Sequence, residues 1–193
     1  ISTVQLLFSQ MGGAFTSSFG NLATENDKKR MYSVYRKSCF VMNSLAFICC
    51  AGFIACIQDF IYIVFGSNFV LSFSCVLILV FSMLIYLLDI PIISVQNAMG
   101  LHRCDAGVMI IQAVLAIACG YGAGKVWGME GILLGLTIPT VIFTFIHKGI
   151  VISKVSFEVT SYKYLKDMGS DLIKGIVIIG VISAICNCIP AWN

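Results

Sequence analysis

Long apolar runs are the feature of this chain that most restricts its fold. The run from Leu77 to Leu88 is interrupted only by Ser82 and Tyr86. A bilayer has a hydrocarbon core about 30 Å thick, so a helix that rises about 1.5 Å per residue needs about 20 apolar residues to cross it. Six windows meet or nearly meet this length: residues 1–22, 38–57, 71–99, 107–124, 131–147 and 172–192.

Helices are the secondary structure expected for these windows. A lipid-exposed sheet would leave the hydrogen-bonding groups of its edge unpaired, and a barrel would show alternation over about ten residues instead of continuous apolar runs. The composition agrees, because 59% of the residues are hydrophobic and 11% are charged, whereas soluble proteins average about 45–50% and about 25%. We therefore predict an all-α polytopic membrane protein with about six transmembrane helices.

Basic residues collect on one side of the predicted membrane. If the helices alternate in direction, every lysine and arginine except Lys125 and Lys174 falls in the loops 23–37, 100–106 and 148–171. Lys174 lies at the start of the last window, on that same side. The positive-inside rule makes these loops cytoplasmic, where they also suit anionic lipid headgroups. The net charge of +3 therefore reflects topology, and no nucleic-acid partner is expected, because no basic patch is interleaved with stacking aromatics.

Residues 1–150 are expected to form a partial C-terminal transmembrane bundle of five helices, and residues 151–193 a cytoplasmic connection with one further transmembrane helix. A weak helical pattern in residues 155–165 leaves open whether that connection lies on the inner surface or is a solvated linker. The chain opens inside a predicted span. We therefore expect preceding helices to be missing and treat the sequence as a fragment.

Glycines at a spacing of four residues indicate close helix packing, because small residues let helix backbones approach in a membrane. Gly120 with Gly124 and Gly131 with Gly135 have this spacing. The alternative is that glycine is simply frequent in spanning helices.

No enzyme chemistry, metal site or cofactor is expected. The cysteines other than Cys104 lie in apolar runs, where they behave as small apolar residues. We find no phosphate-binding loop, no paired-histidine motif and no nucleophile elbow, and the predicted outer loops are short. A membrane glycosyltransferase, polymerase or ligase is therefore disfavoured.

Polar groups within the spans are the candidate functional residues, because such groups are costly in lipid unless they face other helices or a wet cavity. Asp89 is the clearest charge within a span. It shares a seven-residue repeat, and thus one helix face, with three further polar residues: Ser82, Gln96 and Arg103.

The first window carries a similar polar stripe, formed by Gln5, Ser9 and Thr16 with glycines nearby. Two polar faces predict a shared hydrated cavity that forms a substrate path. The alternative is that these groups only hydrogen-bond across a dry helix interface.

Five short segments occur in an order that resembles bacterial oligosaccharide and polysaccharide flippases, the Wzx-type branch of the MATE-like MOP transporter superfamily. They are SSFGNLATENDKKRMYSVYRK, FGSNF, NAMGLHRCDAGVMIIQAVL, GKVWGMEGILLGLTIPT and YKYLKD. The resemblance implies a carrier with two helical bundles around a V-shaped cavity. Its alternating-access cycle would move an undecaprenyl-diphosphate-linked oligosaccharide across the bacterial inner membrane.

The resemblance also implies that this chain is most of the second bundle, that the N-terminal bundle is missing, and that basic residues in the cavity contact the diphosphate. This sequence departs from that pattern, because no lysine or arginine is expected deep within a span. Either the missing bundle supplies the charge, or the phosphate is received at the inner mouth by Arg36, Lys37 and Arg103.

Two other functions stay open. A drug or cation antiporter of the same superfamily would suit Asp89, because a buried carboxylate can bind a cation or a proton. A non-transporting membrane subunit of a glycan-synthesis complex is the alternative from a different functional class.

Overall fold

A computed structural model describes residues 2–25, 27–101, 106–148, 156–157 and 161–188, and this part of the chain is helical with no strand. The elements in chain order are α1 (Ser2–Glu25), α2 (Lys28–Phe65), the 3₁₀-helix η1 (Ser67–Phe69), α3 (Phe73–Met99), α4 (Ala106–Ile142), the π-helix η3 (Phe143–Lys148) and α6 (Ser161–Cys188). Three of them, α2, α3 and α4, are long and apolar enough to cross a membrane. This finding is consistent with the predicted membrane protein.

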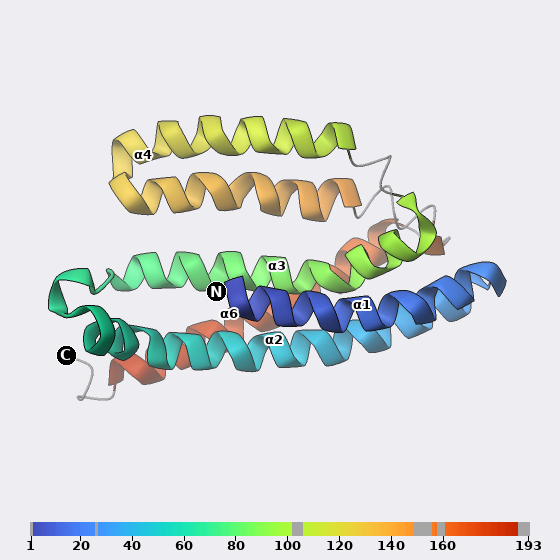
Figure 1. Cartoon of the computed structure of the whole chain (residues 1–193), viewed down its shortest axis with the longest axis horizontal. Coiled ribbons are helices and arrows are strands. Elements are labelled where there is room, and N and C mark those ends of the chain that lie inside the picture. Colours follow the sequence, from blue (N-terminus) through green and yellow to red (C-terminus); the bar gives the residue numbers. More distant parts are fainter. Residues whose placement is uncertain (1, 26, 102–105, 149–155, 158–160, 189–193) are drawn as a thin grey trace.

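The helix α4 reverses direction at Gly128. This residue has φ 60° and ψ −134°, a conformation that glycine reaches without the strain a side chain would cause. Figure 1 shows the two limbs of α4 lying side by side, joined at this turn. The two limbs are helices joined at this non-helical residue, and they correspond to the windows 107–124 and 131–147.

Glycine contacts bring the two limbs of α4 together. A methyl group added at Gly131 would lie 2.1 Å from the carbonyl oxygen of Ala123, and one added at Gly135 would lie 2.5 Å from the backbone of Cys119. On the opposite limb, a methyl group at Gly124 would meet Ile132 at 2.6 Å. The predicted packing role is confirmed for Gly124, Gly131 and Gly135, whereas a methyl group at Gly120 would make only ordinary contacts at 3.8 Å.

The helix α3 is the centre of the fold. It packs against α1, α2, α4 and α6, and its apolar side chains Val80, Leu84 and Leu87 are fully buried in the main core. Figure 1 shows α1, α2 and α6 on one side of α3 and the two limbs of α4 on the other. The turn of α4 is tied to the start of α3 where the Ser72 hydroxyl donates a hydrogen bond to Glu130 at 2.8 Å.

The contact of α1 with α3 is closely packed. A methyl group at Gly12 would lie 2.6 Å from the side chain of Ile90, and the Ser94 hydroxyl donates to the Gly12 carbonyl oxygen at 2.9 Å. Phe8 and Phe19 are buried on the same face of α1. The helix therefore presents its glycine and phenylalanine residues to α3.

Two predicted loops contain helical residues. The loop predicted at 23–37 contains the end of α1 and the start of α2, where the Asp27 side chain caps the helix by accepting from the Arg30 backbone N–H at 3.0 Å. The connection predicted at 151–171 includes the first eleven residues of α6, from Ser161 onward. Hydropathy marks only the apolar part of a helix, so it missed these polar first turns.

The two ends of the helical bundle differ in their content of basic residues. Figure 1 shows the starts of α2 and α6 at one end of the molecule, and η1 with the Gly128 turn at the other. Lys28, Lys29, Arg30 and Lys163 thus share an end, opposite the turn that follows Lys125. This arrangement agrees with the charge asymmetry seen in the sequence.

Candidate functional site

A cavity of about 210 Å³ lies between α3, both limbs of α4 and η3. Its wall combines apolar side chains such as Ile93 and Met109 with polar ones. The polar lining comes from Asp89 of α3, Gln112 and Thr140 of α4, and Thr144, His147 and Lys148 of η3.

An ion pair lines this cavity. The Lys148 ammonium donates a hydrogen bond to the carboxylate of Asp89, whose residue is only 6% exposed. Asp89 lies about 15 Å from the C-terminal end of α3, at about 1.5 Å per residue. A charge buried this far into an apolar helix is costly unless a partner compensates it, and Lys148 is that partner.

Lys148 corrects one expectation from the sequence. The sequence predicts Lys148 in a loop, because the apolar window ends at residue 147. It also predicts no basic side chain deep within a span. In the structure η3 continues the second limb of α4, and its last residue reaches back to Asp89. A lysine can do this because its long aliphatic stem packs along apolar surface while its ammonium reaches a polar partner.

The two limbs of α4 also meet through polar groups at the cavity. The side-chain amide of Gln112 donates to the Thr140 hydroxyl at 3.3 Å, and that hydroxyl donates to the Leu136 carbonyl oxygen at 3.1 Å. Thr144 is buried one turn further along. Sequence reasoning did not select these residues, although Gln112 is the only side-chain amide in its window and was therefore a visible signal.

Of the polar residues predicted for α3, only Asp89 borders this cavity. Gln96 is buried and Ser82 is half-buried, but neither lines it. Each lies seven residues from Asp89, or about 10 Å along the helix axis. The cavity is flanked on α3 by Tyr86 and Ile93, at nearer positions on the same face.

The stripe predicted on α1 does not share the cavity at Asp89, which is lined by α3, α4 and η3. The Ser9 hydroxyl donates to the Leu6 carbonyl oxygen at 2.9 Å, and the Thr16 hydroxyl donates to that of Gly12 at 3.2 Å, so both bond within α1. Gln5 is half-buried. A substrate-path role for these three residues stays a prediction.

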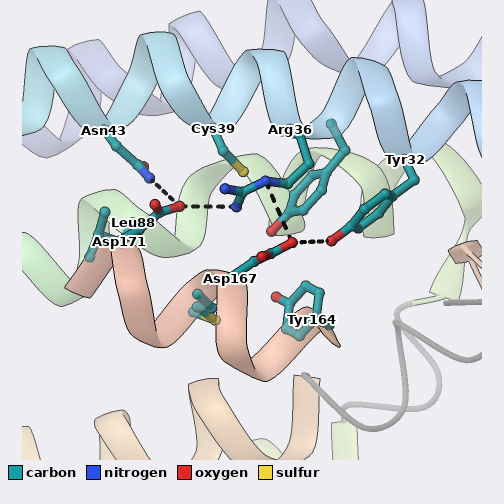
Figure 2. A pocket seen from close by; sticks show the side chains of 10 residues that line it. Tyr32, Arg36, Cys39, Asn43, Leu88, Tyr164, Asp167 and Asp171 are labelled. Atoms are coloured by element: carbon teal, nitrogen blue, oxygen red, sulfur yellow. Dashed lines mark hydrogen bonds and ion pairs between the residues drawn. The ribbon is translucent and has the colours of Figure 1, made fainter. Parts of the chain in front are cut away.

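A second charged region joins α2 to α6, and we name it the Arg36 cluster (Figure 2). It consists of Tyr32, Arg36, Asn43, Asp167 and Asp171. Arg36 Nη1 lies 3.0 Å from Asp171 Oδ2, and Arg36 Nε lies 3.8 Å from Asp167 Oδ2. The Asn43 amide donates to Asp171 at 3.3 Å and the Tyr32 hydroxyl donates to Asp167 at 2.6 Å.

The side chains of this cluster fill the space between the two helices. The cavity that they enclose is only about 10 Å³, about the minimum for one water molecule. Tyr32 and Tyr35 also pack on Phe157, with ring centroids 5.3 and 4.9 Å apart. The polar start of α6 is thus a docked part of the bundle.

The residues predicted to receive phosphate differ in their surroundings. Arg36 is held by two carboxylates and would have to leave them to bind an anion. Lys37 is exposed on α2, beside Phe40 and Val41. Arg103 lies outside the described residues. The phosphate role of all three stays a prediction.

Among the described residues, no three histidine, cysteine or acidic side chains lie close enough to hold a metal ion. No family model, curated protein or solved structure matches the chain. The chemistry of the two charged regions and the resemblance of the short segments are therefore the basis for inferring function.

Proposed function

We propose that the chain is part of a carrier that moves an undecaprenyl-diphosphate-linked oligosaccharide across the bacterial inner membrane for polysaccharide biosynthesis. The observation that supports this proposal is the Asp89–Lys148 ion pair, which borders a cavity between apolar helices. Ionisable groups at such depth are expensive, and they generally serve a substrate path or an ion relay.

In this proposal Lys148 supplies the positive charge that the family resemblance requires. The Lys148 side chain is only 15% exposed, and an ammonium shielded from solvent attracts a phosphate oxygen more strongly than one in bulk water. Asp89 neutralises Lys148 while no substrate is bound. The cavity of about 210 Å³ is smaller than the roughly 300–1,000 Å³ typical of pockets for drug-sized ligands, so it suits a phosphate group and not the whole lipid-linked glycan.

The proposal gives the chain six membrane crossings, formed by α1, α2, α3, the two limbs of α4 and α6. The end that carries the starts of α2 and α6 would then be cytoplasmic. The grouping of basic residues at that end supports this orientation. The arrangement would correspond to the second helical bundle of a MOP-superfamily transporter.

A cation antiporter is the second candidate, because the buried carboxylate of Asp89 lines the cavity. A cation would have to displace Lys148 before it could bind that carboxylate. An anion would likewise have to displace Asp89 from Lys148. Anionic and cationic substrates are therefore distinguished by the transport test that follows.

The test replaces Lys148 by alanine and, as a matched control, by arginine, in cells that rely on the intact gene for glycan export. Surface polysaccharide and retained lipid-linked oligosaccharide are measured, with protein level followed by immunoblotting. Lys148→Ala is expected to lower export at least about tenfold, because a hydrogen bond to a charged group contributes roughly 1.5–3 kcal/mol. Lys148→Arg keeps the charge and should retain most of the export.

Normal export by Lys148→Ala at a normal protein level would reject the proposal. Loss of drug or cation efflux with glycan export intact would support the antiporter instead. Loss of glycan synthesis before the export step would support the non-transporting subunit of a biosynthetic complex.

A further inference from the structure

The helix α1 has an extended polar surface that faces away from α3. Its buried residues Phe8, Gly12, Phe19 and Leu22 mark the side that packs on the bundle. On the opposite side, four exposed polar residues recur every seven positions, and these are Thr3, Gln10, Ser17 and Thr24. Asn21 is exposed on the same side.

This surface is wide. At 3.6 residues per turn, the polar and glycine residues of α1 cover an arc of about 160°. We name this set the polar arc: Ser2, Thr3, Gln5, Ser9, Gln10, Gly13, Thr16, Ser17, Gly20, Asn21 and Thr24. Leu6 and Ala23 are the only apolar residues within it, and it contains no charged residue.

A third sector of α1 is exposed and carries Leu7, Met11 and Ala14, with Ser18 and Glu25 in the same direction toward the end of the helix. Leu7 is 61% and Met11 is 38% exposed, and both lie between the buried face and the polar arc. Exposed leucine and methionine on a helix of a membrane protein suit contact with lipid. Around Leu7 and Met11 the helix therefore carries an exposed apolar surface beside the exposed polar arc.

The amides in the polar arc argue against lipid contact. The hydroxyls of Ser17 and Thr24 donate to carbonyl oxygens of their own helix at 3.0 and 2.7 Å, so lipid would tolerate them. The side-chain amides of Gln10 and Asn21 are exposed and have no hydrogen bond to any described residue. An amide without a partner is costly in hydrocarbon, so these groups need water or a polar ligand.

The width of the arc favours water over a neighbouring helix. The face by which a helix packs on a protein core is about 100° wide or somewhat wider. An arc of about 160° exceeds that width, whereas solvent can satisfy all of it. Its hydroxyls and amides offer both donors and acceptors, which suit the neutral hydroxyl groups of a sugar.

We propose that the polar arc of α1 is one wall of a water-filled passage and that it hydrogen-bonds the sugar hydroxyls of the carried glycan. The inference rests on the proposed function for the identity of the ligand. It separates two tasks in the chain. Lys148 and Asp89 act on the charged phosphate, and the uncharged arc contacts the sugars.

The first test measures contact with water, independently of transport. Cysteine replaces Gln10 or Ser17 of the polar arc, or Leu7 or Met11 of the apolar surface, in the full protein with its native cysteines replaced. These four positions are matched, because all are exposed and all lie in the body of α1. A charged, membrane-impermeant thiol reagent is applied to intact cells and to inverted vesicles. It should label the arc at least about tenfold faster than the apolar surface, because only the hydrated thiolate reacts.

The second test measures contact with the glycan. Gln10→Leu and Asn21→Leu should each lower export several-fold at an unchanged protein level, and Met11→Leu should leave export unchanged. Slow labelling at all four positions would overturn the passage. Fast labelling of the arc combined with normal export by both leucine variants would overturn the sugar contact. Either result leaves the carrier function to be decided separately by Lys148→Ala.

Discussion

The two charged regions of the molecule differ in the space around them. In the Arg36 cluster, Asp171 accepts from Arg36, Asn43 and Lys174, and the enclosed cavity is only about 10 Å³. The Asp89–Lys148 pair borders about 210 Å³ of open space. A charge surrounded by bonded partners has no room to change them, whereas a pair beside a cavity can exchange one partner for a ligand.

Their positions along the helices reinforce this difference. The Arg36 cluster joins the first turns of α2 to the first turns of α6, at the basic end of the molecule (Figure 2). Asp89 lies well inside α3, among apolar neighbours such as Leu88 and Ile90. We infer that the Arg36 cluster fixes α6 on α2, and that the Asp89–Lys148 pair is the changeable element.

The largest effect is expected from removing one member of the changeable pair. Asp89→Leu leaves the Lys148 ammonium without its carboxylate partner, and breaking a buried ion pair costs about 3–5 kcal/mol of stability. The double variant Asp89→Leu with Lys148→Met removes both charges and should recover most of that loss. Thermal unfolding of the purified protein in detergent measures both effects.

Measuring glycan export by the same variants separates an effect on stability from an effect on function. The double variant should fold and still fail to export glycan, because it no longer carries a cation in the cavity. Normal export by the double variant would show that the pair is structural. The two regions would then differ in geometry but not in role.

A smaller effect is expected within the Arg36 cluster. Asp171→Asn removes the charge that faces Arg36 and Lys174 but keeps much of the hydrogen bonding, and Arg36 retains Asp167. Hydrogen bonds to charged groups contribute roughly 1.5–3 kcal/mol, so we expect a destabilisation of about 2 kcal/mol. Export per folded molecule should be unchanged.

Lys174→Ala is the control for this variant. Its side chain is 61% exposed, and exposed ion pairs are typically worth less than about 1 kcal/mol. If Asp171→Asn stopped export while the unfolding temperature stayed constant, the Arg36 cluster would belong to the transport path, as the sequence prediction for Arg36 supposes.

The sequence predicted the features that are set by residues close together in the chain. Apolar windows gave the positions of the helices, and glycine spacing gave the contact within α4. The predicted alternation of direction between the windows 107–124 and 131–147 matches the reversal at Gly128, but hydropathy did not show that this single glycine makes the turn. Polar helix ends were missed because length was judged from apolar residues alone.

Long-range ion pairs could not be predicted in this way. Asp89 was selected because a carboxylate stands out in an apolar run, but its partner is 59 residues away. Arg36 and Asp171 are 135 residues apart. No local pattern links such residues, so Lys148 was assigned to a loop and Arg36 to an open phosphate site. Their partners depend on how the helices pack.

The smallest predicted effect concerns Tyr32. Tyr32→Phe removes the hydroxyl that donates to Asp167 at 2.6 Å but keeps the ring that packs on Phe157. The expected loss is about 1 kcal/mol, a shift of roughly 2–4 °C in unfolding temperature for a chain of this size. Tyr62→Phe is the matched control, because Tyr62 is exposed at the other end of α2 and should give no shift. Equal shifts for the two variants would show that the Tyr32 bond adds no stability. In that case the Arg36 cluster would depend on fewer bonds than its geometry indicates, and its contrast with the Asp89–Lys148 pair would rest on the difference in cavity volume alone.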